Sequence, residues 1–237
     1  GSPTLNPSRA AIIASDTWAT VSRSYREELR RGSPLAPLLT RAPHPFATGN
    51  GIPVLARENL LENLATNTHE SAKNYLQKNY FHMDVPDSSI PMFAFVGRIS
   101  MQKGVHLIAD AAEELINVFD GKIQFLIAGP AMWEDRYSAQ CSKKLQWLHS
   151  TYPNSFWADP NLFFTDGPVV NIGADFALMP SLFEPGGIVQ HEFFVGGTPV
   201  IAFCTGGLKD SVIEWNPSTR KGGGFVFHKH QIYDYRM

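Results

Sequence analysis

Residues 180–192 combine groups that a site for an anionic ligand would need, in the order P-S-L-F-E-P-G-G-I-V-Q-H-E. Pro185 suits the first turn of a helix, and Gly187 would let a ligand approach the backbone closely. The free N–H groups at such a helix start favour an anion. Glu184 and Glu192 have seven residues between them, and this spacing of about two helical turns would let both carboxylates face one cleft. An ordinary strand–turn–helix junction with solvated acids is the alternative interpretation.

Two cations lie in another loop, residues 97–104, which reads G-R-I-S-M-Q-K-G and follows the apolar run M-F-A-F-V. An anion at this loop would meet the planar guanidinium of Arg98 and the ammonium of Lys103. With the helix start near Gly187, these cations could hold a diphosphate without a metal. The sequence contains no D-x-D motif, which fits such a site. On their own, both side chains also fit surface charges at a turn.

The same residue types permit other chemistry. Paired carboxylates act as acid and base in glycoside hydrolysis, but hydrolase carboxylates do not need an adjacent diphosphate site. We therefore disfavour hydrolysis for Glu184 and Glu192. His228 and His230 form a short H-K-H sequence, which is a weak metal signal. We expect no metal site.

The elements that must position these loops are strands alternating with helices. Apolar runs predict strands at residues 92–96, 123–128, 161–165, 174–179, 198–203 and 225–227. Helical patterns are predicted at residues 23–31, 70–80, 105–118, 131–149, 187–195 and 205–215. This alternation predicts right-handed crossovers and a Rossmann-like α/β fold, a parallel sheet with helices on both faces. Ligands of such sheets bind at the carboxyl ends of strands, so the loops at 97–104, 184–187 and 205–208 should share one rim.

Less regular stretches separate these elements. Residues 10–22 predict a strand followed by a turn, and the prolines and glycines of residues 34–53 predict a long loop or interdomain segment. Residues 153–160 are a second predicted loop. We place a domain boundary after residue 85. Residues 1–85 would hold the end of an amino-terminal domain, an interdomain segment and a linking helix, and residues 86–237 the sheet domain.

Composition limits the partners of the chain. It has 237 residues, of which 43% are hydrophobic and 18% charged, and a formal net charge of −2, an ordinary globular profile. No basic run is longer than two residues, the length of Arg30-Arg31, which argues against nucleic acid as a partner. No apolar run reaches membrane-spanning length and no signal peptide is recognisable, so we expect no membrane partner. Cys141 and Cys204 form no C-x-x-C pair, which favours reduced thiols and a cytoplasmic location.

Three loops in this order resemble those of the glycogen and starch synthases, retaining glucosyltransferases of the two-domain GT-B architecture. Residues 97–104 are similar to that family's G-R-x-x-x-Q-K-G loop. Residues 180–188 are similar to P-S-R-F-E-P-C-G-L, with Leu182 in place of Arg and Gly186 in place of Cys. Residues 205–212 are similar to T-G-G-L-x-D-T-V. The segment 166–172 is short where the family contacts the nucleotide base.

The resemblance implies roles for these residues. Arg98 and Lys103 would neutralise the donor diphosphate and the leaving nucleotide, and Glu184 would bind donor glucose hydroxyls and orient the anomeric carbon. These three would be the catalytic residues. The implied donor-binding residues are Gly97, Gly187, Ile188, Glu192, Thr205 and Gly206. Among these, Gly187 and Ile188 would offer backbone N–H groups to the phosphates, and Glu192 would contact the ribose.

The resemblance also implies a reaction and its partners. The intact protein would transfer glucose with retention from ADP-glucose or UDP-glucose, without a cofactor, to an α-1,4-glucan. The acceptor would bind through an amino-terminal domain that this chain lacks, so the chain alone should turn over little or nothing. It would act in the cytoplasm, or in a plastid in a photosynthetic lineage. A GT-B transferase with another acceptor and a non-catalytic nucleotide-sugar-binding module remain the alternatives.

Overall fold

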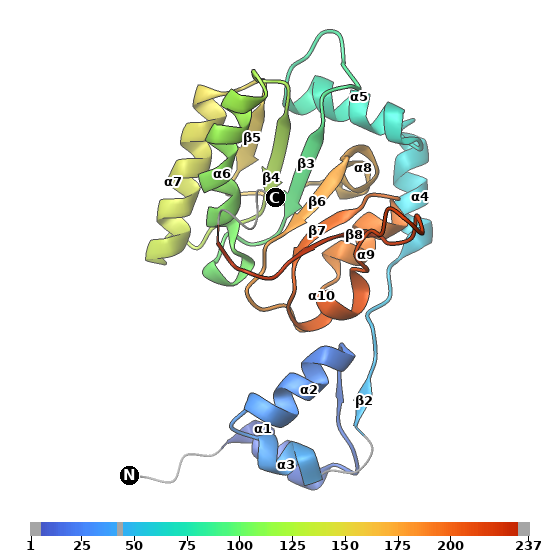
Figure 1. Cartoon of the computed structure of the whole chain (residues 1–237), viewed down its shortest axis with the longest axis vertical. Helices are drawn as coiled ribbons and strands as arrows, with labels where there is room; N and C mark the ends of the chain where they lie inside the picture. Colours follow the sequence, from blue (N-terminus) through green and yellow to red (C-terminus); the bar gives the residue numbers. More distant parts are fainter. Residues whose placement is uncertain (1–5, 42–44, 232–237) are drawn as a thin grey trace.

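The larger part of the chain is a six-stranded parallel sheet (Figure 1). The computed structural model describes residues 6–41 and 45–231. The strands run in the order β5-β4-β3-β6-β7-β8. Their bounds are β3 Met92–Val96, β4 Gln124–Ala128, β5 Phe156–Asp159, β6 Phe176–Met179, β7 Val200–Phe203 and β8 Gly224–Phe227. The predicted Rossmann-like fold class is confirmed.

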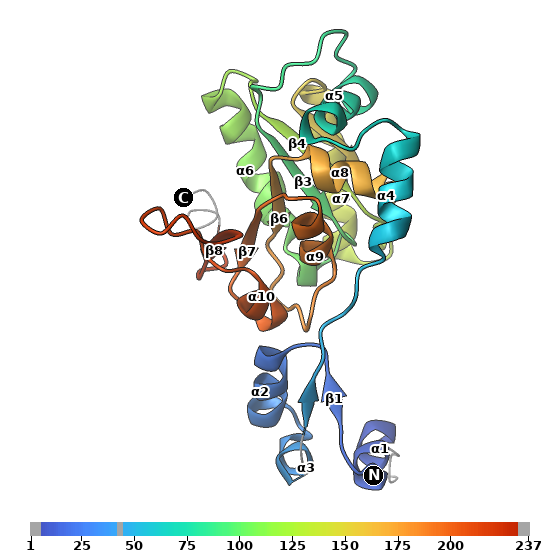
Figure 2. The same ribbon diagram turned by 90° about the vertical axis from the view of Figure 1, so that its right-hand side faces the viewer.

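Helices pack against both faces of this sheet (Figure 2). One core joins the sheet to α6 (Val105–Val118) and α7 (Arg136–Thr151). The other core joins it to α5, α8, α9 and α10, whose bounds are His69–Tyr80, Gly167–Gly173, Val189–Val195 and Gly206–Ser211. The two cores explain why Met92–Val96 is apolar throughout, since a strand covered on both faces has no side that faces solvent.

The strand order indicates which edge of the sheet is expected to bind a ligand. From β3 the chain runs outward through β4 to β5, then returns to β6 on the other side of β3. The loops after β3 and β6 therefore diverge from a topological switch point, where α/β sheets form a crevice beyond the carboxyl ends of their strands. Residues 97–104 follow β3 and residues 180–188 follow β6. Two of the three predicted loops thus flank this crevice.

The amino-terminal residues form a smaller lobe below the sheet in Figure 1. It contains α1 (Pro7–Ala14), β1 (Ala19–Thr20), α2 (Arg23–Gly32), α3 (Ala36–Arg41) and β2 (Phe46–Ala47), and α4 (Val54–Asn63) leads back to the sheet. The strand predicted within residues 10–22 is wrong over its first part. Asn6 accepts a hydrogen bond from the N–H of Arg9, and Pro7 occupies the first turn, so a capped helix forms. The predicted loop at 34–53 contains α3 and β2.

Residues 153–173 also differ from the prediction. The expected loop at 153–160 contains strand β5, and the expected strand at 161–165 is absent from the described structure. Phe156 and Ala158 are buried, whereas Leu162 and Phe163 are more than half exposed. The apolar run thus follows the strand instead of forming it. Helix α8, which no pattern predicted, comes next.

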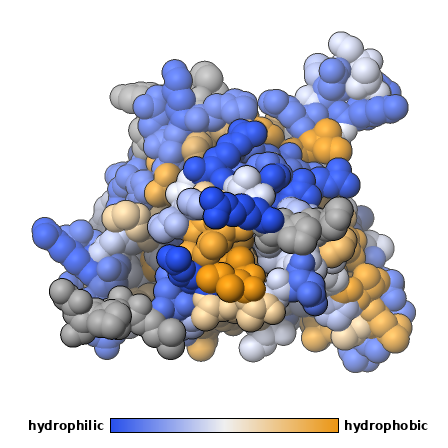
Figure 3. All heavy atoms as spheres, turned by 90° about the horizontal axis from the view of Figure 1, so that it is seen from below, coloured by the Kyte–Doolittle hydropathy of each residue, from blue (hydrophilic) through white to orange (hydrophobic). Residues whose placement is uncertain are grey.

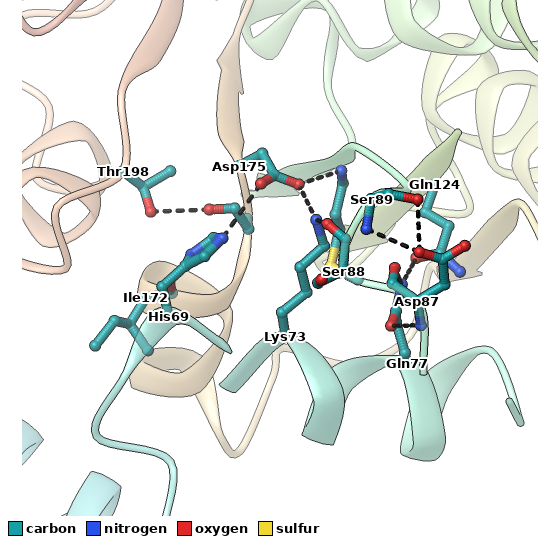
Figure 4. A network of polar contacts seen from close by, with 12 residues as sticks. His69, Lys73, Gln77, Asp87, Ser88, Ser89, Gln124, Ile172, Asp175 and Thr198 are labelled. Atoms are coloured by element: carbon teal, nitrogen blue, oxygen red, sulfur yellow. Dashed lines mark hydrogen bonds and ion pairs between the residues drawn. The ribbon is translucent and has the colours of Figure 1, made fainter. Parts of the chain in front are cut away.

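A buried polar network holds α5 against the amino ends of the strands (Figure 4). The ammonium of Lys73, 1% exposed, lies 2.7 Å from a carboxylate oxygen of Asp175 and donates to the carbonyl of Ser88. Asp175 also accepts the N–H of Met92 at 2.6 Å. Because Met92 begins β3 and Asp175 precedes β6, this network lies at the opposite end of the sheet from the crevice. The boundary after residue 85 stays a prediction, although α5 packs with the sheet.

Candidate functional site

A buried ion pair lies where the loops after β3 and β6 meet. A short 3-10 helix, Met101–Lys103, brings the ammonium of Lys103 to 2.5 Å from Oε2 of Glu184. The Ser181 hydroxyl donates to the same oxygen at 3.0 Å. Glu184 is only 6% exposed, so these two donors replace the hydrogen bonds that its Oε2 would make with water. An ammonium has three N–H groups, so Lys103 retains donors for a ligand.

Backbone contacts fix these two loops against each other. The N–H of Leu182 donates to the carbonyl of Gln102 at 2.8 Å, and the Gln102 amide donates to the carbonyl of Phe183 at 2.9 Å. Gly104, in the left-handed region at φ +66°, lets the carbonyl of Pro180 approach closely. A Cβ at position 104 would lie 2.0 Å from that oxygen. The two loops therefore form one rigid rim.

The loop after β7 joins the same rim. The hydroxyl of Thr205 donates to the carbonyl of Leu182 at 3.2 Å, and the N–H of Gly207 donates to the carbonyl of Glu184 at 2.8 Å. Gly206 has φ +43°, and a Cβ there would lie 2.1 Å from the Glu184 carbonyl oxygen. The three loops at the strand ends thus converge as the sequence predicts.

The turn before α9 differs from the prediction. The helix begins at Val189, so Pro185 lies before the first helical turn. Gly187 adopts φ +68°, and within the described residues the N–H groups of Gly187 and Ile188 donate to no protein acceptor. Both groups are therefore available to a ligand. Gln190, which no sequence pattern singles out, supports this turn by donating to the carbonyl of Gly186 at 2.8 Å.

The two acids of residues 180–192 do not share a partner. Glu184 pairs with Lys103, whereas Glu192 on α9 lies 3.2 Å from a guanidinium nitrogen of Arg57 on α4. Arg57 also donates to the side chain of Asn171 on α8. The expected spacing of two helical turns between the acids is wrong, because the four residues after Glu184 are not helical and α9 begins only at Val189.

Arg98 and Gly97 follow β3 directly. The Arg98 side chain is exposed and makes no ion pair with another of the described residues, so it is free to meet a ligand. The N–H of Gly97 donates to the carbonyl of Ala128 in the neighbouring strand. The Gly97 carbonyl lies so close to Gly129 that a Cβ there would be 1.8 Å away. Gly97 therefore shapes the backbone, and its N–H is already engaged.

The amino-terminal lobe also reaches this rim, which sequence reasoning did not foresee. The Ser22 hydroxyl donates to the carbonyl of Pro185, and Asp210 accepts both the N–H and the hydroxyl of Ser24, at 2.9 and 2.7 Å. The N–H of Gly206 points to Glu28 on α2 at 3.3 Å. Seen from below, this end of the molecule is mostly hydrophilic, with apolar side chains near its middle and at the lower right (Figure 3).

Within residues 6–41 and 45–231, no cluster of three His, Cys, Asp or Glu side chains has the geometry to hold a metal ion. No helix of that part of the chain is long and apolar enough to cross a bilayer.

Burial raises the pKa of the Cys141 thiol to about 12, so this thiol stays protonated and inert at neutral pH.

The fold and these loops define a Rossmann-like α/β domain in which three loops gather at the carboxyl ends of the strands, the edge where sheets of this kind bind ligands. The family model for glycosyl transferases group 1 matches residues 83–235, and the chain belongs to this family of glycosyltransferases. A glycogen synthase from Fervidobacterium nodosum is 31% identical over 232 residues, which cover 94% of this chain and 46% of the relative. The chain thus spans about half the length of the curated relatives it matches.

Solved structures show the same fold. The catalytic domain of starch synthase IV from Arabidopsis thaliana, bound to ADP and acarbose, has a TM-score of 0.76 at 23% identity and covers 98% of this chain and 49% of that chain. Anabaena HepE in complex with UDP has a TM-score of 0.61 at 17% identity, over 94% of this chain and 53% of that one.

Proposed function

We propose that this chain is the donor-binding half of a retaining glucosyltransferase that extends an α-1,4-glucan from a nucleotide-glucose. The Lys103–Glu184 pair carries this proposal, because it is held at the meeting point of the three post-strand loops. The family membership and the similarity to glycogen synthases over nearly the whole chain support the same reaction.

In the proposed mechanism, cations stabilise the departing nucleotide diphosphate. Lys103 keeps one donor on Glu184 and directs its remaining donors to the diphosphate, while the unpaired guanidinium of Arg98 adds a second positive charge. Glu184 accepts hydrogen bonds from glucose hydroxyls through the oxygen that Lys103 and Ser181 leave open. The sugar then develops oxocarbenium character without a protein nucleophile or a metal.

The remaining donor-binding residues divide into two groups. Gly187 and Ile188 supply the two open N–H groups to the phosphates. Gly97, Thr205 and Gly206 act by shaping the rim, since their own N–H groups are engaged with Ala128, Phe203 and Glu28 respectively.

Glu192 contacts the ribose in this proposal. Its Oε1 pairs with Arg57, which leaves Oε2 for a ribose hydroxyl. The base is adenine or uracil, since the related structures hold ADP or UDP. The glucan acceptor binds to the part of the enzyme outside this chain. We place the reaction in the cytoplasm, or in a plastid.

Titration with ADP and with UDP by calorimetry tests the phosphate role. Arg98→Ala should weaken binding of the preferred nucleotide by about 10-fold or more, because a charge-assisted hydrogen bond contributes about 1.5–3 kcal/mol. Lys122→Ala is the matched control, because Lys122 is an exposed cation before β4, at the other end of the sheet. Equal affinities of the Arg98→Ala variant and the unmodified protein would count against the proposal.

A further inference from the structure

One motif is not explained by the proposed reaction, the H-K-H sequence after β8. Nε2 of His230, its second histidine, lies 2.7 Å from the carbonyl oxygen of Pro180 and donates a hydrogen bond to it. Since a carbonyl oxygen can only accept, Nε2 must carry the proton. The contact spans 50 residues of sequence and ends in the loop that carries Glu184.

The His230 ring is fixed by its neighbours. It packs edge-on against Phe203, the last residue of β7, with 5.0 Å between the ring centroids, and lies 5.6 Å from the ring of His106 at the start of α6. Burial, and next the nearby His230, lower the pKa of His106. The ring of His230 is therefore held by two other elements while it contacts Pro180.

The Pro180 carbonyl lies between His230 and the loop of residues 97–104, which carries Arg98 and Lys103. Gly104 presses against it from one side, and a Cβ at position 104 would also lie 2.8 Å from Nε2 of His230. Ser181, the next residue, donates to Glu184, which pairs with Lys103. The peptide unit between Pro180 and Ser181 thus connects His230 to Ser181, one of the two side chains that donate to the Glu184 carboxylate.

We propose that His230 is a positioning residue: by holding the Pro180 carbonyl it fixes Ser181 and the Glu184 carboxylate opposite Lys103. It touches no substrate. The expected effect of His230 on nucleotide binding rests on the proposed function. Its expected effect on the order of residues 180–188 does not.

Four chains test this proposal: the unmodified protein, His230→Ala, His230→Gln and His230→Asn. The amide nitrogen of Gln reaches the position of Nε2, whereas that of Asn corresponds to Nδ1 and cannot reach the carbonyl. His228→Ala is the control, because His228 belongs to the same segment after β8 but lines a separate groove, whose lining includes Phe93, Phe125 and Phe225. Hydrogen exchange of residues 180–188 reports on the loop, and calorimetric titration with ADP and UDP reports on the donor site.

Loss of one hydrogen bond should raise exchange in residues 180–188 by about 2- to 10-fold for Ala and Asn, but not for Gln or for the control. Nucleotide affinity should fall by a similar factor and be rescued by Gln. Unchanged exchange in these residues overturns the proposal. So does a uniform rise that includes Met92–Val96, since that would show a general loss of stability. If the unmodified chain binds neither nucleotide, the proposed function fails, while the exchange data still decide the role of His230.

Discussion

Replacing Lys103 by Met should destabilise the fold and also remove nucleotide affinity, and the two losses can be separated. Met keeps most of the apolar stem but leaves Glu184, 6% exposed, with Ser181 as its remaining partner among the described side chains. Removing one member of a buried pair costs about 3–5 kcal/mol. Because the Lys103 side chain is 17% exposed, water can reach the carboxylate. We therefore expect Lys103→Met to lower the free energy of unfolding by about 2–3 kcal/mol.

A second substitution isolates the cause. Glu184→Gln in the Lys103→Met background removes the stranded charge and should restore about half or more of the lost free energy of unfolding, but not the nucleotide affinity. Urea unfolding, followed by tryptophan fluorescence and circular dichroism, measures the first quantity and calorimetry the second.

Lys144→Met is the matched control for this experiment. Lys144 lies 2.5 Å from Asp110, the same distance as in the Lys103 pair, but the two side chains are 39% and 45% exposed. We expect Lys144→Met to lower the free energy of unfolding by less than about 0.5 kcal/mol. If Lys103→Met costs no more than Lys144→Met, or if Glu184→Gln restores nothing, the burial argument is refuted.

Three further outcomes follow from the structure. Gly206→Ala should abolish nucleotide binding in calorimetry, because its Cβ would lie 2.1 Å from the Glu184 carbonyl oxygen; normal affinity would contradict the rim geometry. Lys73→Met should lower the free energy of unfolding by about 3 kcal/mol in urea, since it leaves Asp175 and the Ser88 carbonyl without their ammonium; a loss below about 1 kcal/mol would refute this. Iodoacetamide at pH 8 should alkylate Cys204 and spare Cys141, whose pKa is raised to about 12 by burial; rapid labelling of Cys141, detected by mass spectrometry, would oppose this.

Much of the sheet domain could be predicted from its hydrophobic pattern. Met92–Val96 and Val105–Val118 have the predicted bounds, because a fully buried strand and an amphipathic helix leave distinct periodic patterns. Residues 161–165 misled the prediction, since an apolar run beside an edge strand has the composition of a strand. Helix α8 was missed because seven residues, Gly167–Gly173, are too few to show a helical period.

The site was predictable in its loops but not in its partners. Residues 97–104, 180–188 and 205–208 converge because parallel strands end at one edge. The Arg57–Glu192 pair joins residues 135 positions apart, and the His230–Pro180 contact joins residues 50 apart. Such pairs leave no short-range pattern in the sequence, because only tertiary packing brings their residues together.

A crystal structure of this chain with bound ADP or UDP tests the central claim most directly. We predict phosphate oxygens at about 2.7–3.2 Å from the Lys103 ammonium and from the N–H of Gly187 or Ile188. A nucleotide bound elsewhere, with the Lys103–Glu184 pair facing only solvent, would contradict the account.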